Sequence, residues 1–304
     1  MKNYAFIFAG QGSQKCGMGL DFYNNFTKSK ELLEEASDKI KLDFYKLLFT
    51  QNDEINISEY TQPAILLNAM MIYNEISVKP KYALGHSLGE ISAICAMGGM
   101  DFGEAIYLTN MRGKFMQECA DSKNPAGMLV SLGLDDEKVE SICAELQKEG
   151  LKVYAANYNC DGQIVLAGLK SDLEKSIDVL KSSGAKRAML LNMSVASHCP
   201  LMASASEKFA SLLDGKLKDM DTPIIANSTT KPYKKAQDAQ NALKDQLIKP
   251  VLYKQSIKEI ENDVDVFVEF GSNVLSGLNK KITTKPTVSI TTLDEFDSFC
   301  KEYL

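Results

Sequence analysis

The sequence feature that most restricts the fold is a short apolar strand, Tyr82-Ala83-Leu84, followed at once by Gly85-His86-Ser87-Leu88-Gly89 and an apolar helix through Met97. This G-x-S-x-G pattern between a strand and a helix is typical of a nucleophile elbow, in which the glycines permit a sharp turn and a serine projects from the strand end. The amide of the next residue then points to where an oxyanion would form, beside the helix N-terminus. The pattern predicts an α/β sheet with Ser87 as a nucleophile.

Other segments fit the same α/β class. Residues 4–8 are an apolar run that ends in the glycine-rich loop 10–14, and 264–270 is expected as a late strand. Thr61-Gln62-Pro63 is expected to open a buried helix, with Thr at the cap and Pro in the first turn. Asp101 and Glu104 have the spacing of a capping box and are expected to start the helix that carries Arg112. Residues 231–249 are polar and charged and are expected to form a solvated helix or loop.

The middle of the chain has a different pattern. Strands are expected at 127–133, 151–157, 163–167 and 186–193, and helices at 135–149 and 171–183. This βαββαβ order is the ferredoxin-like arrangement. We therefore predict an α/β-hydrolase-like large domain, built from residues 1–122 and 194–304, with a ferredoxin-like small domain inserted at 123–193.

The histidine count restricts the chemistry. The chain has only two, His86 and His198, which argues against a histidine-rich metal site, and no metal is expected. A serine nucleophile needs a base, and at such an elbow the side chain beside the serine points away from the reacting face. We therefore favour a role for His198 as the general base over the alternative that it is a hydrogen-bonded core or loop residue without a catalytic role. No acid between Ser87 and His198 stands in a recognisable setting, so another group is expected to orient the base.

Composition excludes several classes of protein. With 34 Lys and Arg against 40 Asp and Glu, the net charge is −6, which disfavours a nucleic-acid binder held by bulk charge. Seven cysteines without a C-x-x-C pair fit reduced thiols in the cytoplasm. No apolar stretch is long enough to span a membrane, and the N-terminal one is too brief for a signal peptide. The loop 10–15 matches neither the dinucleotide nor the P-loop pattern, so no cofactor is expected.

Several motifs in register resemble the malonyl-CoA:acyl-carrier-protein transacylases. They are Gly10-Gln11-Gly12-Ser13-Gln14, Thr61-Gln62-Pro63-Ala64, Gly85-His86-Ser87-Leu88-Gly89-Glu90, Met111-Arg112-Gly113, Gly184-Ala185-Lys186-Arg187, Ser197-His198-Cys199-Pro200-Leu201-Met202 and Val274-Leu275-Ser276-Gly277-Leu278. The resemblance runs from residue 5 to about residue 290 and implies the same two-domain fold.

The resemblance also implies roles for individual residues. Ser87 would be acylated and His198 would be its base, oriented by a main-chain carbonyl near Lys249-Pro250-Val251. The backbone amides of Gln11 and Leu88 would form the oxyanion hole, and Arg112 would clamp the malonyl carboxylate. Gln62 and Met116 would also be substrate-binding residues, and Gln62 and Gln246 match positions near the site with lesser roles.

By this resemblance the chain is expected to move a malonyl group from CoA to the pantetheine thiol of acyl carrier protein, for fatty acid synthesis, with malonyl-CoA as a substrate. Acyl carrier proteins are acidic, so a local basic patch is expected, with Lys186, Arg187, Lys280 and Lys281 as candidates. The alternative is a serine thioesterase or esterase that uses the same elbow. A third, weaker hypothesis is a partner-binding module without catalytic activity. A monomer is the working expectation, and no nucleic-acid or membrane partner is expected.

Overall fold

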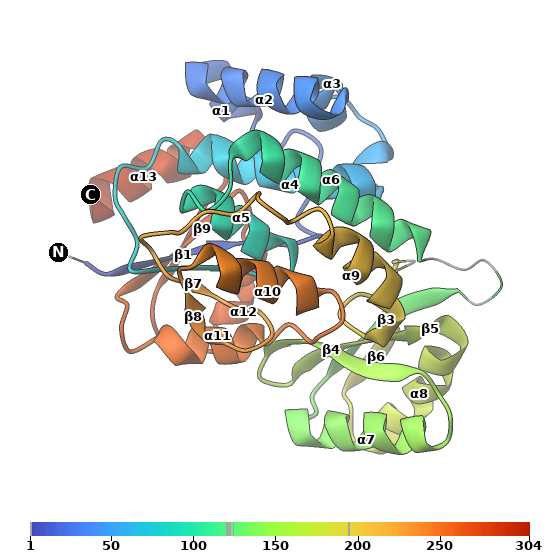
Figure 1. The fold of residues 1–304 in the computed structure, drawn as a ribbon. Helices are drawn as coiled ribbons and strands as arrows, with labels where there is room; N and C mark the ends of the chain where they lie inside the picture. The colour runs from blue at the N-terminus through green and yellow to red at the C-terminus, as the bar shows by residue number, and fades with distance from the viewer. Residues whose placement is uncertain (1, 120–122, 124, 194) are drawn as a thin grey trace.

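The structure is a computed structural model that describes residues 2–119, 123, 125–193 and 195–304. A large sheet and a small sheet lie in separate parts of the molecule (Figure 1). The large sheet has the strand order β10-β9-β1-β2-β7-β8, parallel except for β8. Its strands are β1 (Tyr4–Phe8), β2 (Tyr82–Gly85), β7 (Ile224–Ile225), β8 (Pro232–Tyr233), β9 (Val266–Phe270) and β10 (Thr287–Ile290).

Both faces of the large sheet are covered by helices, which explains why β1 is apolar at every position. Side chains alternate along a strand, so Phe6 and Phe8 join one hydrophobic core while Ala5 and Ile7 join another. The first core contains residues of α4 (Ser58–Tyr73), α5 (Leu88–Ala96) and α6 (Phe102–Glu118). The second contains residues of α11 (Tyr253–Ile260) and α12 (Val274–Asn279).

The remaining helices outside the small sheet add to the first core. They are α1 (Leu20–Asn25), α2 (Thr27–Ile40), α3 (Phe44–Phe49), α9 (Ala203–Ala210), α10 (Ala236–Gln246) and α13 (Leu293–Tyr303), with 3-10 turns η1 (Glu54–Asn56) and η2 (Pro200–Met202). The expectation for 231–249 was incomplete. Helix α10 is amphipathic, with Ala239, Leu243 and Gln246 buried, so its last residue can reach the interior.

The small sheet has the predicted βαββαβ order. Its elements are β3 (Ala126–Leu132), α7 (Asp136–Lys148), β4 (Val153–Cys160), β5 (Gln163–Leu169), α8 (Lys170–Ser182) and β6 (Arg187–Leu190). The strands pair antiparallel in the order β4-β5-β3-β6, and α7 and α8 lie on the side away from the large sheet (Figure 1). Residues 122 and 194, at the predicted domain boundaries, lie outside the described residues, so the exact division stays a prediction.

One expected helix start was wrong. Helix α4 begins at Ser58, not Thr61, so Pro63 lies inside the helix. Proline has no N–H to donate to the carbonyl four residues earlier, and Asn110 Nδ2 instead donates to that carbonyl, Glu59 O, at 2.9 Å. A neighbouring helix thus satisfies the acceptor that Pro63 leaves open.

Helix α6 begins where expected but without a capping box. Asp101 occupies the N-cap position and makes no side-chain cap hydrogen bond. Its carboxylate pairs with Lys218 at 2.5 Å, and Glu104 pairs with Lys39 and Lys216. The two acidic side chains therefore form ion pairs with residues distant in the chain, and not the capping box that their spacing predicted.

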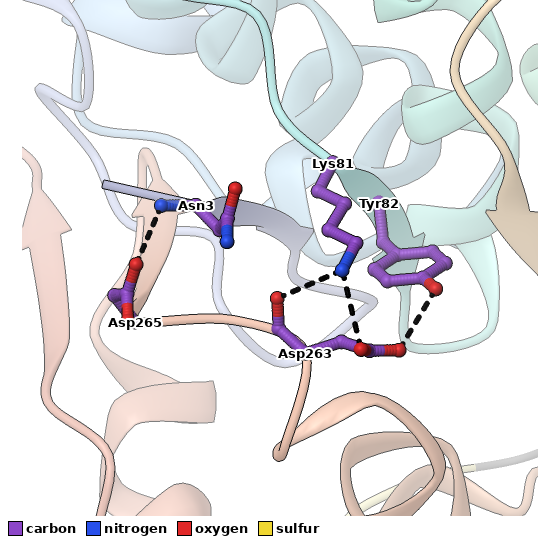
Figure 2. A network of polar contacts seen from close by, with 5 residues as sticks. All are labelled: Asn3, Lys81, Tyr82, Asp263 and Asp265. Atoms are coloured by element: carbon purple, nitrogen blue, oxygen red, sulfur yellow. Dashed lines mark hydrogen bonds and ion pairs between the residues drawn. The ribbon is translucent and has the colours of Figure 1, made fainter. Parts of the chain in front are cut away.

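A polar network fastens the amino ends of three neighbouring strands (Figure 2). Asn3 N donates to Asp265 Oδ2 at 2.7 Å, which joins the start of β1 to the segment before β9. Lys81 Nζ and Tyr82 Oη both donate to the Asp263 carboxylate, at 3.2 and 3.1 Å. These contacts lie at the amino ends of the parallel strands. Ser87 lies at the opposite, carboxyl ends, where the loops that follow β1, β2 and β9 meet.

Candidate active site

The serine elbow forms where β2 ends at Gly85 and α5 begins at Leu88. Ser87 has φ 55° and ψ −112°, a strained backbone for a residue with a side chain. The glycines serve close packing: a Cβ on Gly85 would lie 1.9 Å from the carbonyl carbon of Gly89, and one on Gly89 would lie 1.9 Å from Phe8 O. The strained serine, rather than its glycines, therefore carries the unusual backbone angle.

His198 faces Ser87. His198 Nε2 lies 2.7 Å from Ser87 Oγ, and His198 Nδ1 lies 2.8 Å from the main-chain oxygen of Gln246. A carbonyl can only accept, so Nδ1 carries the proton and Nε2 has its lone pair toward the hydroxyl. A main-chain carbonyl, Gln246 O at the end of α10, thus orients His198, close to the segment that the resemblance implied. A backbone hydrogen bond from Lys249 of that segment also acts on His198.

The surroundings keep His198 neutral. Burial lowers its pKa to about 3, and the positive charge of Arg112 acts in the same direction. The Gln246 carbonyl opposes this shift by accepting from Nδ1–H. At neutral pH the imidazole is therefore uncharged and free to accept a proton from Ser87.

Arg112 is 1% exposed and lies beside Ser87. Its Nη1 donates to Gln62 Oε1 at 2.8 Å, and its Nη2 donates to Ser87 Oγ at 3.1 Å and to Gln246 Oε1 at 2.9 Å. Burial lowers its pKa to about 10, and the charge of Glu90 opposes that shift. The guanidinium therefore stays charged at neutral pH, and its partners are neutral groups that leave it able to bind a carboxylate.

A buried polar network surrounds the side chains of Ser87, His198 and Arg112. Gln246 Nε2 donates to Glu90 Oε2 at 2.7 Å and to Ser87 O at 3.0 Å. Asn227 accepts from Ser87 N at 2.7 Å and donates to Gly85 O at 2.6 Å, which clamps the elbow.

Sequence reasoning missed Asn227 and Glu90. The available signal for Glu90 was an acidic residue in the first turn of an otherwise apolar helix.

The other predicted residues lie close by. Gln62 Nε2 lies 3.3 Å from Met116 Sδ, which places Met116 against the residue that holds the guanidinium. Gln11 follows β1 and its side chain donates to Ser58 Oγ at 2.9 Å. Leu88 is fully buried as the first residue of α5. The use of the Gln11 and Leu88 amides as an oxyanion hole stays a prediction.

A cavity of about 200 Å³ opens over the nucleophile, and the residues that line it include Gln11, Ser87, Arg112 and His198. His86 also lines it, and His86 Nε2 lies 2.8 Å from Asn159 Oδ1 of β4. Burial lowers the pKa of His86 as well. His86 thus links the elbow to the small sheet, and His198 is the imidazole that reaches Ser87.

Across residues 2–119, 123, 125–193 and 195–304, no three His, Cys, Asp or Glu side chains converge on a candidate metal site. Over the same residues no helix has the length and apolar character needed to cross a membrane.

A serine at a strained elbow, a neutral histidine and a buried guanidinium on an α/β-hydrolase-like sheet define the class of serine acyltransferases and hydrolases. Within that class the chain matches the acyl transferase domain family over residues 5–289. It is 36% identical to the malonyl CoA-acyl carrier protein transacylase of Bacillus subtilis (strain 168) over 292 residues, which cover 94% of this chain and 92% of that protein.

Solved structures agree. The malonyl-CoA:acyl carrier protein transacylase of Helicobacter pylori is 42% identical and superposes with a TM-score of 0.95 over 100% of both chains. A malonyl-transacylase in complex with a type II PKS acyl-carrier protein is 35% identical, with a TM-score of 0.93 over 97% of this chain and 98% of that one. This chain belongs to the malonyl-CoA:acyl-carrier-protein transacylase family.

Proposed function

We propose that this protein transfers a malonyl group from CoA to the pantetheine thiol of acyl carrier protein through a malonyl ester on Ser87. The observation that carries the proposal is the buried Arg112 guanidinium, whose Nη2 is 3.1 Å from Ser87 Oγ. A planar guanidinium can hold a carboxylate through two parallel hydrogen bonds. A charged group at this place suits an acyl group that ends in a carboxylate.

Acylation begins when His198 Nε2 removes the proton of the Ser87 hydroxyl as Oγ attacks the thioester carbonyl. Such general-base help contributes roughly 10²–10⁴ in rate. The backbone amides of Gln11 and Leu88 hold the tetrahedral oxyanion, and each donor of this kind is worth about 3 kcal/mol. The proton then passes from His198 to the CoA sulfur, which leaves as the thiol.

Transfer follows the same path in reverse. The pantetheine thiol gives its proton to His198 and its sulfur attacks the malonyl ester on Ser87. Collapse of the second tetrahedral intermediate returns the proton to Ser87 Oγ and releases malonyl-carrier protein. The names of the relatives support this acceptor, since one homologous malonyl-transacylase is described in complex with an acyl-carrier protein.

The nucleophile is tested by incubating the protein with malonyl-CoA and measuring its intact mass. We expect an added malonyl group in the wild type and none in Ser87→Ala. Arg112→Lys is a useful companion variant, since it should still form the adduct, but more slowly. A normal adduct in Ser87→Ala would contradict the assignment of the nucleophile.

Hydrolysis of the same ester is the competing outcome, as in a thioesterase. With carrier protein present, we expect malonyl-carrier protein to exceed free malonate. A predominance of malonate would instead support hydrolase activity. We also place the reaction in the cytoplasm, which is supported by seven cysteines that are all free thiols in the structure.

A further inference from the structure

We infer that Glu90 is a positioning residue that fixes the orientation of the Gln246 side-chain amide and thereby aims the Arg112 guanidinium at the malonyl carboxylate. This inference rests on the proposed function. The Glu90 main-chain N–H donates to Ser87 O at 3.0 Å, but among the described residues the Glu90 carboxylate accepts only from Asn227, Tyr233 and Gln246. Any effect of the carboxylate on the substrate must therefore pass through a neighbour. That neighbour is Gln246, which contacts both the carboxylate and the guanidinium.

The direction of each hydrogen bond determines how the Gln246 amide must lie. Burial raises the pKa of Glu90, while hydrogen bonds from Gln246, Tyr233 and Asn227 and the positive charge of Arg112 oppose that shift. In its ionised form Glu90 Oε2 can only accept, so the Gln246 NH₂ must face it at 2.7 Å. The same NH₂ donates to Ser87 O at 3.0 Å. The amide oxygen is then left facing Arg112 Nη2 at 2.9 Å. If the Gln246 amide were flipped, its NH₂ would face the Arg112 N–H groups, so that two donors would meet. Its oxygen would then face the Glu90 carboxylate, so that two acceptors would meet.

Glu90 is itself held rigidly as the fixed end of this relay. It is 0% exposed in the first turn of α5, where the helix dipole favours an anion. Tyr233 Oη donates to Glu90 Oε1 at 3.0 Å, and the main-chain N–H of Asn227 donates to Glu90 Oε2 at 3.3 Å. With the Gln246 amide, three donors converge on a carboxylate that water cannot reach, and its rotamer is fixed.

The spacing of the charges explains why a glutamine lies between them. A carboxylate in direct contact with Arg112 would occupy the donors that the substrate carboxylate needs. Behind Gln246, the negative charge of Glu90 still acts on the buried guanidinium. Arg112 Nη2 donates to the neutral Ser87 Oγ and Gln246 Oε1, and Arg112 Nε has no hydrogen-bond partner among the described residues. Glu90 thus supplies a counter-charge without competing for the malonyl group.

The test is Glu90→Gln, which keeps the shape and removes the charge. The new side chain can present its own NH₂ to Gln246, which allows the amide to flip and pushes Arg112 from its place. We expect the ratio of malonyl to acetyl acylation of Ser87 to fall at least about tenfold, as for one lost charged hydrogen bond, with KM for malonyl-CoA rising. Acetyl-CoA has no carboxylate, so its acylation rate should change little.

A control variant separates positioning from general stability. Glu269→Gln neutralises another fully buried carboxylate, which accepts from Leu275 N and Ser276 N away from this relay. This variant should lower thermal stability and keep the malonyl-to-acetyl ratio.

Several results would overturn the inference. One is an unchanged ratio in a folded Glu90→Gln, and another is an equal fall of the ratio in Glu269→Gln. If Glu90→Gln does not fold, Gln246→Met tests the same relay from its other end, and an unchanged ratio there overturns it as well. Absence of any malonyl adduct in the wild-type protein would instead contradict the proposed function.

Discussion

Replacing Arg112 by alanine tests the central claim about substrate choice. A bound malonyl carboxylate would accept two charge-assisted hydrogen bonds from this side chain in a site that excludes water. Each such bond is worth about 1.5–3 kcal/mol, so the pair amounts to about 3–6 kcal/mol, or roughly 10²–10⁴ in kcat/KM for malonyl-CoA. The acetyl group has no carboxylate and should lose far less.

The substitution has structural costs that both substrates share. It leaves Gln62 Oε1 and Gln246 Oε1 without the donors that lie 2.8 and 2.9 Å away in the structure. The ratio of malonyl to acetyl acylation cancels this common loss, so that ratio is the quantity to measure, by stopped-time intact mass of the acyl-enzyme. Equal losses with the two thioesters would refute the assignment of Arg112 as the carboxylate clamp.

A pH measurement on the same variant gives an independent check. The positive charge of Arg112 is one cause of the low pKa of His198, about 3 in the intact site. Removing that charge should raise the pKa of His198, so its protonation should impair acetyl acylation at a higher pH than in the wild type. An acid limb that stays in place or moves to lower pH would contradict the electrostatic coupling.

Three further predictions concern the base, the elbow and the carrier protein. His198→Ala should slow acylation by roughly 10²–10⁴, measured as the rate of adduct formation, and an unchanged rate would remove it as the base. Gly89→Ala should lower the free energy of unfolding by about 3 kcal/mol in urea titrations, because its Cβ would meet a β1 carbonyl oxygen. Gly277→Ala, with open space around it, is the control, and equal stability of the two variants would contradict this packing. Lys280→Glu with Lys281→Glu should weaken use of carrier protein and spare acylation by malonyl-CoA, and unchanged carrier kinetics would exclude both from the docking patch.

Much of the fold could be predicted from local pattern. The β1 run and the segment after Tyr82 are apolar and short, and each ends at a glycine-containing turn, which is enough to predict parallel strands that are covered on both faces. The order of strands and helices in the small sheet followed from the same periodicity. The predictions that failed were local rules overridden by distant partners, as when Asn110 satisfied the carbonyl that Pro63 left open.

The site was predictable only in part, for a related reason. Ser87 stands in a five-residue pattern, and His198 followed from a count of two histidines. The group that orients His198 could not be found this way, because it is a backbone oxygen and every residue has one. Glu90 and Asn227 were missed because a buried polar residue looks like an exposed one until its neighbours are known.

The sequence by itself predicted most of the elements, the candidate nucleophile and the family resemblance, because each depends on residues that are close together in the chain or on motifs kept in order. Only the tertiary structure decided which carbonyl holds His198, what balances the charge of Arg112, and why the elbow glycines are needed. Most of those answers depend on groups far apart in the chain that come together only when it folds. His198 and Gln246 are 48 residues apart, and Glu90 and Gln246 are 156 residues apart. Burial then changes their chemistry, since the same histidine and arginine would titrate near their ordinary pKa values in an unfolded chain.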